Sequence, residues 1–131
     1  MLLNRKLGAL ATCATALLVV VGLASPADAT EKNGVVELGE FGLYLNTGST
    51  GTVFDLYFSD SDFNNDNFPG TSIPVANNTE SYRNRDVYYW HFFTDANYNG
   101  SQGCAASGGV GDLTPTFKDN IESAYFSTTQ C

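Results

Sequence analysis

Hydrophobic and polar residues alternate along residues 40–45 and again along residues 52–58. Alternation with a period of two is typical of a β-strand, whose successive side chains point to opposite faces. Residues 46–51 lie between the two segments and are rich in Gly, Ser, Thr and Asn, so the pair is predicted to be a hairpin. The shared apolar face carries Phe41, Leu43 and Leu45 from the first segment and Phe54, Leu56 and Phe58 from the second.

The remainder of the chain continues the β pattern. Residues 86–94 are rich in Tyr, Trp and Phe and are predicted to form a mostly buried strand, and residues 95–100 repeat the hairpin chemistry. Residues 59–70 and 100–111 are predicted to be loops because of their Asp, Asn, Gly and Ser content, with short helical turns near residues 115–118. The pattern predicts an all-β sandwich or Greek-key unit with about eight short strands.

The N-terminal segment differs from the rest in charge and hydropathy. Two basic residues precede an apolar run over residues 7–24, and Ala27-Asp28-Ala29 gives the small-x-small pattern of a signal peptidase site. We expect residues 1–29 to be a signal peptide and residues 30–131 to be a single secreted domain. A retained membrane anchor and a lipoprotein attached through Cys13 are alternatives that fit the pattern less well.

The chain is acidic, with a formal net charge of −8. An acidic secreted domain repels nucleic acid and anionic lipid, so we expect neither as a partner, and no membrane attachment after cleavage. Only Cys104 and Cys131 remain after the predicted cleavage. In an oxidising compartment two cysteines most simply form one structural disulfide. We expect a monomer.

Two short patterns each occur twice. An aromatic residue is followed by a glycine seven positions later at residues 44–51 and at residues 93–100, and Asx-Asx-x-Glu-Ser occurs at residues 77–81 and 119–123. A repeat with this spacing indicates one supersecondary unit used twice around a shared core. We expect the first unit over about residues 35–85 and the second over about residues 86–131.

The repeated patterns resemble the signatures of the βγ-crystallin Greek keys. Residues 93–100 match the folded-hairpin pattern of aromatic, four residues, aromatic, one residue, glycine, whereas Ser49 replaces the second aromatic in the first copy. The Asx segments are similar to the calcium motif of that family. Together with the signal peptide and the chain length, Tyr82-Arg83-Asn84-Arg85 and residues 94–100 also resemble the secreted bacterial peptidase inhibitor family I36, which has the same fold and includes metalloproteinase inhibitors.

The resemblance implies calcium ligands in both copies. A crystallin-type site combines the side chain of the second Asx, the next carbonyl, the hydroxyl at the fifth position and a hairpin carbonyl. Because both second positions are Asn, the ligands carry little charge, and we expect weak binding near 10⁻⁴ M, about the range of extracellular modules. Equally, the two serines can bond hairpin backbone and close the fold with no ligand. The implied ligands are Thr47, Asn78, Thr79 and Ser81 with Ala96, Asn120, Ile121 and Ser123.

Catalysis is not expected. His91 is the only histidine, and it lies in the aromatic segment that is predicted to be a strand. If the two mature cysteines pair, no thiol is free, and the sequence contains neither His-Glu-x-x-His nor Gly-x-Ser-x-Gly. A zinc site would need three or four ligands of a kind that the mature chain lacks.

The resemblance to family I36 implies a secreted inhibitor whose partner is an extracellular protease. A rigid loop would bind such a protease at low entropic cost. The alternative is a calcium-stabilised extracellular structural or stress module without inhibitory activity, and a toxin or antifungal protein on this scaffold is a third reading to which no residue points. The predicted disulfide would fix the candidate inhibitory loop, but the glycines around this segment equally fit a simple connector. The candidate residues are Gln102, Gly103, Cys104, Ala105 and Ala106.

Overall fold

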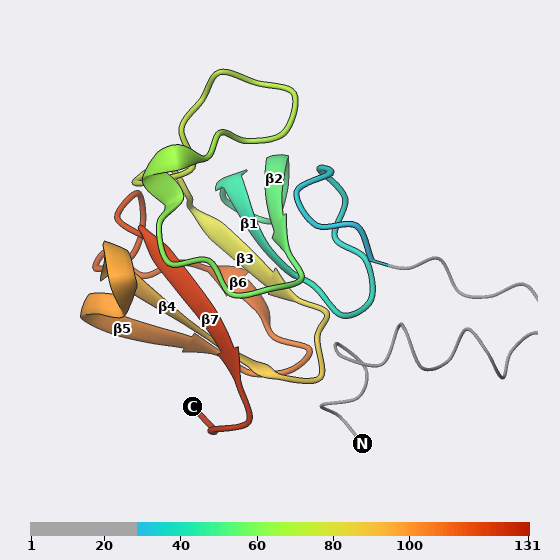
Figure 1. The fold of residues 1–131 in the computed structure, drawn as a ribbon, viewed down its shortest axis with the longest axis vertical. Coiled ribbons are helices and arrows are strands. Elements are labelled where there is room, and N and C mark those ends of the chain that lie inside the picture. Colours follow the sequence, from blue (N-terminus) through green and yellow to red (C-terminus); the bar gives the residue numbers. More distant parts are fainter. Residues whose placement is uncertain (1–28) are drawn as a thin grey trace, which may run out of the picture.

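The computed structural model describes residues 29–131 (Figure 1). All but the last residue of the predicted signal peptide lies outside this range, so the cleavage site stays a prediction. Within the described part, no helix has the length and apolar character needed to cross a membrane.

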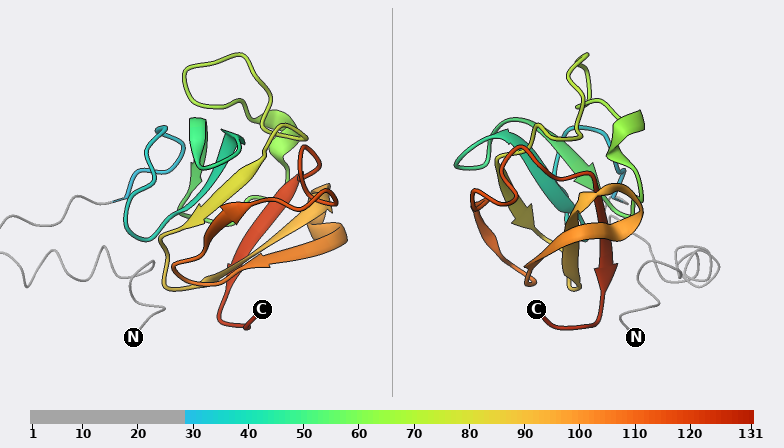
Figure 2. Two further views of the ribbon diagram at one scale, coloured as in Figure 1. Left: turned by 180° about the vertical axis from the view of Figure 1, so that it is seen from behind. Right: turned by 90° about the vertical axis from the view of Figure 1, so that its left-hand side faces the viewer.

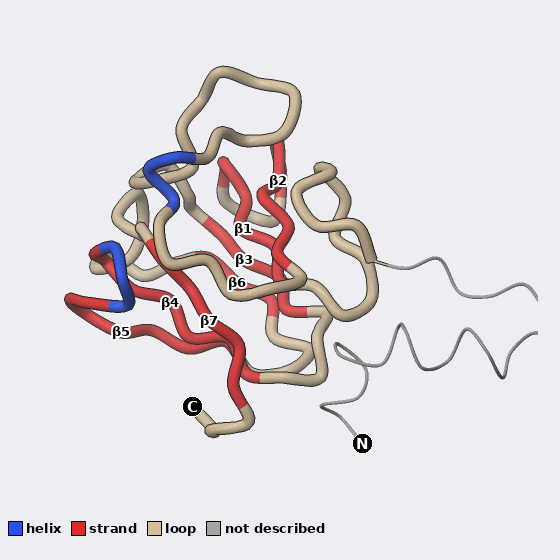
Figure 3. The backbone as a smooth tube through the Cα atoms, in the orientation of Figure 1, coloured by secondary structure: helices blue, strands red, loops and turns tan. Residues whose placement is uncertain are grey.

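Within the described residues, seven strands form two antiparallel sheets, which confirms the predicted all-β sandwich (Figures 1 and 3). The first sheet has the order β2-β1-β3-β6 and the second the order β5-β4-β7. Two single 3-10 turns, η1 (Phe63–Asn65) and η2 (Ala96–Tyr98), interrupt the connections. The strands are β1 (Phe41–Asn46), β2 (Thr50–Leu56), β3 (Ser81–Asn84), β4 (Tyr89–Asp95), β5 (Asn99–Ala105), β6 (Val110–Asp112) and β7 (Ser123–Ser127).

The two repeats exchange strands. β6 belongs to the second repeat but pairs with β3 of the first sheet, where Tyr82 lies opposite Gly111. In return, Asp60 of the first repeat bridges to Ala124 of β7 through two backbone hydrogen bonds of 2.9 and 3.0 Å. Each sheet therefore contains backbone from both repeats, and this short bridge stands where an eighth strand would complete the pattern.

The core lies between the two sheets and is rich in aromatic side chains. The ring of Phe41 stacks at 5.1 Å on Trp90 and at 6.3 Å on Phe92, so that β1 of one sheet contacts β4 of the other. Phe41, Phe54 and Trp90 are fully buried. Burial of a large apolar side chain stabilises a fold by roughly 1.5–3 kcal/mol, so these contacts between the repeats contribute strongly to its stability.

The first predicted hairpin is confirmed: β1 and β2 pair from Phe41 opposite Leu56 to Tyr44 opposite Val53, and the register shifts by one residue before Asn46 opposite Thr50. One detail of the prediction is wrong. β2 ends at Leu56, and Phe58 lies beyond it with 51% of its surface exposed. The chain leaves the sheet here because the backbone N–H groups of Tyr57 and Phe58 donate to the Glu31 carboxylate instead of to a strand.

The predicted loop over residues 100–111 is also wrong, because most of it forms β5 and β6. Gly103 packs under the ring of Phe92, and a Cβ at this position would lie 2.6 Å from Phe92 Cζ. Glycine in this segment thus permits a close approach between a strand and a ring. The other predicted loop, residues 59–70, is confirmed apart from the single turn of η1.

Candidate functional site

The two serines of the repeated motif close the two folded hairpins in the same way. Ser81 Oγ donates to the Asn46 carbonyl at 2.6 Å and accepts from the Ser49 N–H at 2.9 Å. Ser123 Oγ donates to the Asp95 carbonyl at 2.7 Å and accepts from Tyr98 N–H at 3.1 Å. Each hydroxyl joins a strand to the hairpin folded over it, which is the fold-closing role considered for these residues.

The signature glycines are required by the same geometry. Gly51 and Gly100 have φ of 78° and 81°, in the left-handed region that favours glycine. A Cβ on Gly100 would lie 2.8 Å from Asp95 Oδ2. The two hairpins differ at the second aromatic position, because Tyr98 packs its ring against Phe93 and Tyr125 whereas the first copy has Ser49.

The Asx segments of the two repeats are joined to each other. Asn77 N–H donates to the Ile121 carbonyl at 3.1 Å, and Asp119 N–H donates to the Thr79 carbonyl at 2.8 Å. This reciprocal pair relates the repeats by an approximate two-fold axis. These two hydrogen bonds place the first Asx segment beside the start of β7 at Ser123 and the second Asx segment beside the start of β3 at Ser81.

The side chains of the second Asx residues are also used alike. Asn78 Nδ2 donates to the Pro74 carbonyl at 2.9 Å, and Asn120 Nδ2 donates to the Thr116 carbonyl at 3.0 Å. In each case the amide nitrogen is held by a carbonyl four residues earlier. The amide oxygens are therefore the side-chain atoms of these residues that remain for a cation.

The hairpin carbonyls predicted as ligands already accept hydrogen bonds. Thr50 Oγ1 donates to the Thr47 carbonyl at 2.7 Å, and Asn99 Nδ2 donates to the Ala96 carbonyl at 3.2 Å. Across residues 29–131, no group of three or more His, Cys, Asp or Glu residues could hold a metal ion. The predicted oxygens are of the kind that calcium takes, but they are neutral and partly occupied, so they fit a weak site only.

One carboxylate that the sequence did not indicate lies at the first hairpin. Gly48 N–H donates to Asp112 Oδ1 at 2.7 Å, although the two residues are 64 positions apart. β6 brings Asp112 opposite Ser81 of β3. No signal within either repeat could have revealed this contact, because it depends on the exchange of strands.

Burial and charge also differ between the copies. Ser49 Oγ and Thr79 Oγ1 near the first hairpin are buried and have no hydrogen-bond partner among the described residues. Partial burial, together with the charge of Glu80, raises the pKa of Asp119 above its ordinary value. Lys118 lies 3.7 Å from Glu80 and opposes this effect. The two sites are therefore unequal in electrostatics as well as in sequence.

The candidate inhibitory residues lie in and just after β5. Gln102 to Ala105 pair with β4, with Ala105 buried opposite Trp90. The disulfide between Cys104 and Cys131 is confirmed, with a Cα–Cα separation of 5.5 Å, and it fixes the C-terminal tail to this strand. Whether these residues contact a protease stays a prediction.

A buried asparagine that the sequence analysis did not select connects the repeats. Asn84 Nδ2 lies 2.9–3.0 Å from the carbonyls of Tyr88, Ala105 and Ala106, and Asn84 Oδ1 accepts from Asp86 N–H. The only hint in the sequence was its place in the Tyr-Arg-Asn-Arg segment, which carried a resemblance but no role.

The exchanged strands, the two serine-closed hairpins and the paired Asx segments define the βγ-crystallin class of fold. A βγ-crystallin domain studied for the evolution of the eye-lens fold superposes with a TM-score of 0.59 at 18% identity, covering 82% of this chain and 96% of its own. Domains from Flavobacterium johnsoniae and Clostridium beijerinckii superpose with TM-scores of 0.56 at 21% and 13% identity, covering 66% and 69% of this chain and 92% and 99% of their own.

Within that class the family can be stated. The model of peptidase inhibitor family I36 matches residues 37–107, more than half of the sequence, and the chain belongs to this family. Comparison with curated protein sequences gave no match.

Proposed function

We propose that this protein is a secreted, non-enzymatic inhibitor of an extracellular peptidase, with metalloproteinases as the target class. The observation that carries the proposal is the match of residues 37–107 to peptidase inhibitor family I36. The disulfide between Cys104 and Cys131 agrees with an oxidising, extracellular location.

The environment of His91 supports a role other than catalysis. Its side chain is 3% exposed, and both ring nitrogens have partners: Nε2 lies 3.0 Å from the Thr129 carbonyl and Nδ1 lies 2.7 Å from Gln102 Nε2. A general base must reach a proton of the substrate. A histidine that is covered and bonded on both sides cannot do so without losing these contacts.

Inhibition by a small sandwich depends on rigidity. A surface that is already ordered loses little conformational entropy when it binds, so more of the contact energy appears as affinity. The closed hairpins and the joined Asx segments supply that order without a ligand.

The test is inhibition of thermolysin by the protein secreted from its full-length precursor. We expect inhibition at micromolar concentration or below, and N-terminal sequencing should show Thr30 as the first residue. A reduced and alkylated sample is the control for non-specific protection of the substrate. Thermolysin activity that is unchanged at micromolar protein would reject the metalloproteinase target.

We further propose that calcium binds weakly near the two hairpins. The ligands would be the amide oxygens of Asn78 and Asn120, the two motif serines and neighbouring carbonyls, and Asp112 adds a carboxylate at the first hairpin. Because affinity follows ligand charge, the first site should be the stronger. A melting temperature that is equal in millimolar calcium and in EDTA would reject binding, and Asp112→Asn should reduce any increase.

The inhibition assay and the melting temperatures together distinguish the proposed inhibitor from the alternative function. A calcium-stabilised structural module would show the rise in melting temperature without inhibiting thermolysin or other peptidases.

A further inference from the structure

The first repeat contains an insertion that the second repeat lacks. Phe63 and Leu113 are equivalent, because their N–H groups donate to the carbonyls of Glu122 and Glu80 in the two Asx motifs. From Phe63 the chain takes 14 residues to reach Asn77, whereas from Leu113 it takes 6 to reach Asp119. The second repeat closes its Greek key without this extra length, so the fold itself does not require it.

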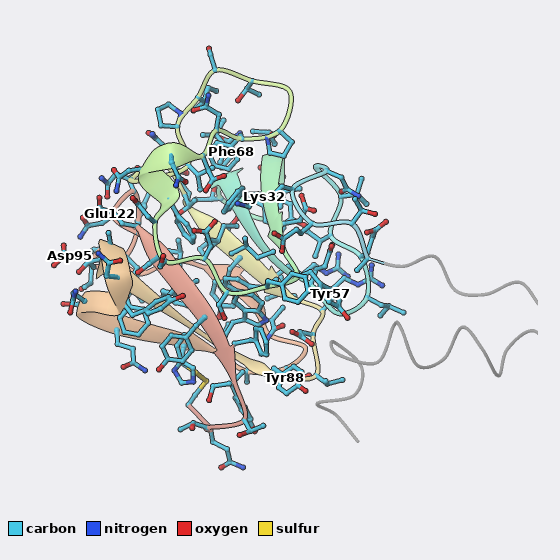
Figure 4. The ribbon with its side chains drawn as sticks, viewed as in Figure 1. Lys32, Tyr57, Phe68, Tyr88, Asp95 and Glu122 are labelled. Carbon is cyan, nitrogen blue, oxygen red and sulfur yellow. A yellow bond between two sulfur atoms is a disulfide. The ribbon has the colours of Figure 1, made fainter. Side chains whose placement is uncertain are left out.

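The extra residues form a loop that projects from one end of the molecule, here called the projecting loop and defined as residues 66–75. All views in Figures 1 and 2 show it extending beyond the sheets, and the C-terminus lies towards the opposite end. Figure 4 shows Phe68 at its base. Phe68 and Val75 are fully buried and anchor the loop in the core.

The projecting loop is ordered by its own hydrogen bonds. Phe68 N–H donates to the Ile73 carbonyl at 2.9 Å, and Val75 N–H donates to the Asp66 carbonyl at 3.0 Å. Thr71 N–H donates to the Phe68 carbonyl at 3.0 Å across a Pro-Gly turn in which Gly70 has φ of 73°. At the base, Lys32 Nζ lies 3.0 Å from Asp66 Oδ1. The loop is therefore preorganised without a disulfide.

The tip of the projecting loop has the surface chemistry of a peptide ligand. Residues 67–74 contain no charged side chain in a chain whose net charge is −8. Gly70, Ser72, Ile73 and Pro74 are exposed, and Ile73 presents a branched apolar side chain that is 37% exposed. Ile73 N–H is held by Thr71 Oγ1 at 3.1 Å, which fixes the backbone that carries this side chain.

We propose that the projecting loop is the surface that enters the substrate cleft of the target peptidase, with Ile73 filling an apolar subsite. This inference rests on the proposed inhibitory function and names the part of the molecule that performs it. An ordered, uncharged tip with one exposed apolar anchor fits a cleft that takes peptide segments. Gln102–Ala105 fit less well, because all four residues are paired with β4 and Gly103 packs under the ring of Phe92.

The test compares variants of the secreted protein by their inhibition constants for thermolysin. Ile73→Asp should weaken inhibition about thirtyfold or more, the effect of losing an interface anchor worth roughly 2 kcal/mol. Ile73→Ala is a milder second variant and should weaken inhibition about tenfold. The matched control is Val110→Asp, which puts the same charge at another exposed β-branched residue, 58% exposed on β6, and should leave inhibition unchanged.

Two further arms separate the outcomes. Thermolysin whose cleft is filled by a small active-site inhibitor should no longer bind the protein, and thermal unfolding should be the same for all variants. Inhibition that survives Ile73→Asp but is lost on Gln102→Ala would reject the projecting loop as the surface that binds the peptidase. The proposed inhibitory function would then still hold. A wild-type protein that does not inhibit thermolysin would reject the metalloproteinase target and, with it, the binding of the projecting loop in the cleft of such an enzyme.

Discussion

At the scale of single residues, Glu40 is the group whose environment departs most from that of a surface carboxylate. It is fully buried, its Oε2 accepts from Glu37 N–H at 2.7 Å, and its Oε1 has no hydrogen-bond partner among the described residues. Burial is the main cause that raises its pKa to about 7, and the charges of Asp55, Glu37 and Glu31 act in the same direction. The hydrogen bond from Glu37 opposes the shift.

This pKa predicts how stability depends on pH. Because the folded state binds the Glu40 proton more tightly than the unfolded state, the contribution of Glu40 to the free energy of unfolding should be fully present below about pH 4.5 and be lost as the pH rises through about 7. The raised pKa corresponds to a loss on the order of 3 kcal/mol. Glu40→Gln should remove this part of the slope and make the protein more stable than wild type at pH 8.

Urea denaturation of wild type and variant between pH 4.5 and 8 measures the effect. Other buried carboxyls such as Asp55 have raised pKa values too, so the difference between the two proteins isolates Glu40. Asp95→Asn, at an exposed carboxylate, is the control for a general effect of net charge. Parallel curves for wild type and Glu40→Gln would contradict the prediction.

At the scale of elements, the packing of β5 on β4 gives a second prediction. Gly103→Ala would bring a methyl group against Phe92, and overpacking of a core contact costs about 1–3 kcal/mol. Ser101→Ala, at an exposed position of the same strand, is the control. Chemical denaturation should show the loss for Gly103→Ala alone. Equal midpoints for the two variants would mean that the Phe92 ring can move aside.

The C-terminal tail gives a third prediction. Beyond β7 it is held by the Cys104–Cys131 disulfide and by the contact of the Thr129 carbonyl with His91. Closing a loop of 27 residues contributes about 3–4 kcal/mol in the chain-entropy model. The double variant Cys104→Ser, Cys131→Ser should therefore melt well below the oxidised wild type and match the reduced wild type. A melting temperature equal to that of the oxidised protein would show that the tail adds no stability.

These elements also show what the sequence could predict. Alternation and turn residues sufficed for β1 and β2, because one face of the hairpin is apolar and its turn uses local glycines. Aromatic content sufficed for β4, whose residues 90–93 are all buried. β5 was missed because its small residues indicate a loop by composition, whereas Gly103 among them lets the strand pass close under the Phe92 ring. The contacts of Asn84 and Asp112 were missed because each joins the two repeats, and a motif within one repeat carries no information about its partner.

At the scale of the whole molecule, the exchange between the repeats makes each half incomplete. The first sheet includes β6 from the second repeat, and the second sheet is bridged by Asp60 from the first. The stack of Phe41 on Trp90 and the hydrogen bonds of Asn84 cross the same boundary. Separation at residue 86 would expose backbone and apolar surface on both sides, and chains of such length bury too little surface to compensate.

Residues 30–86 and residues 87–131, expressed separately, should therefore each be unfolded, and the intact domain should unfold in a single cooperative transition. Circular dichroism and the dispersion of amide NMR signals measure the first expectation, and coincident denaturation curves from fluorescence and circular dichroism measure the second. Mixing the two fragments is the control, because complementary halves should regain amide dispersion together. A fragment that melts cooperatively by itself would mean that one Greek key suffices for folding. The exchanged strands would then hold the two Asx segments together more than they stabilise the core.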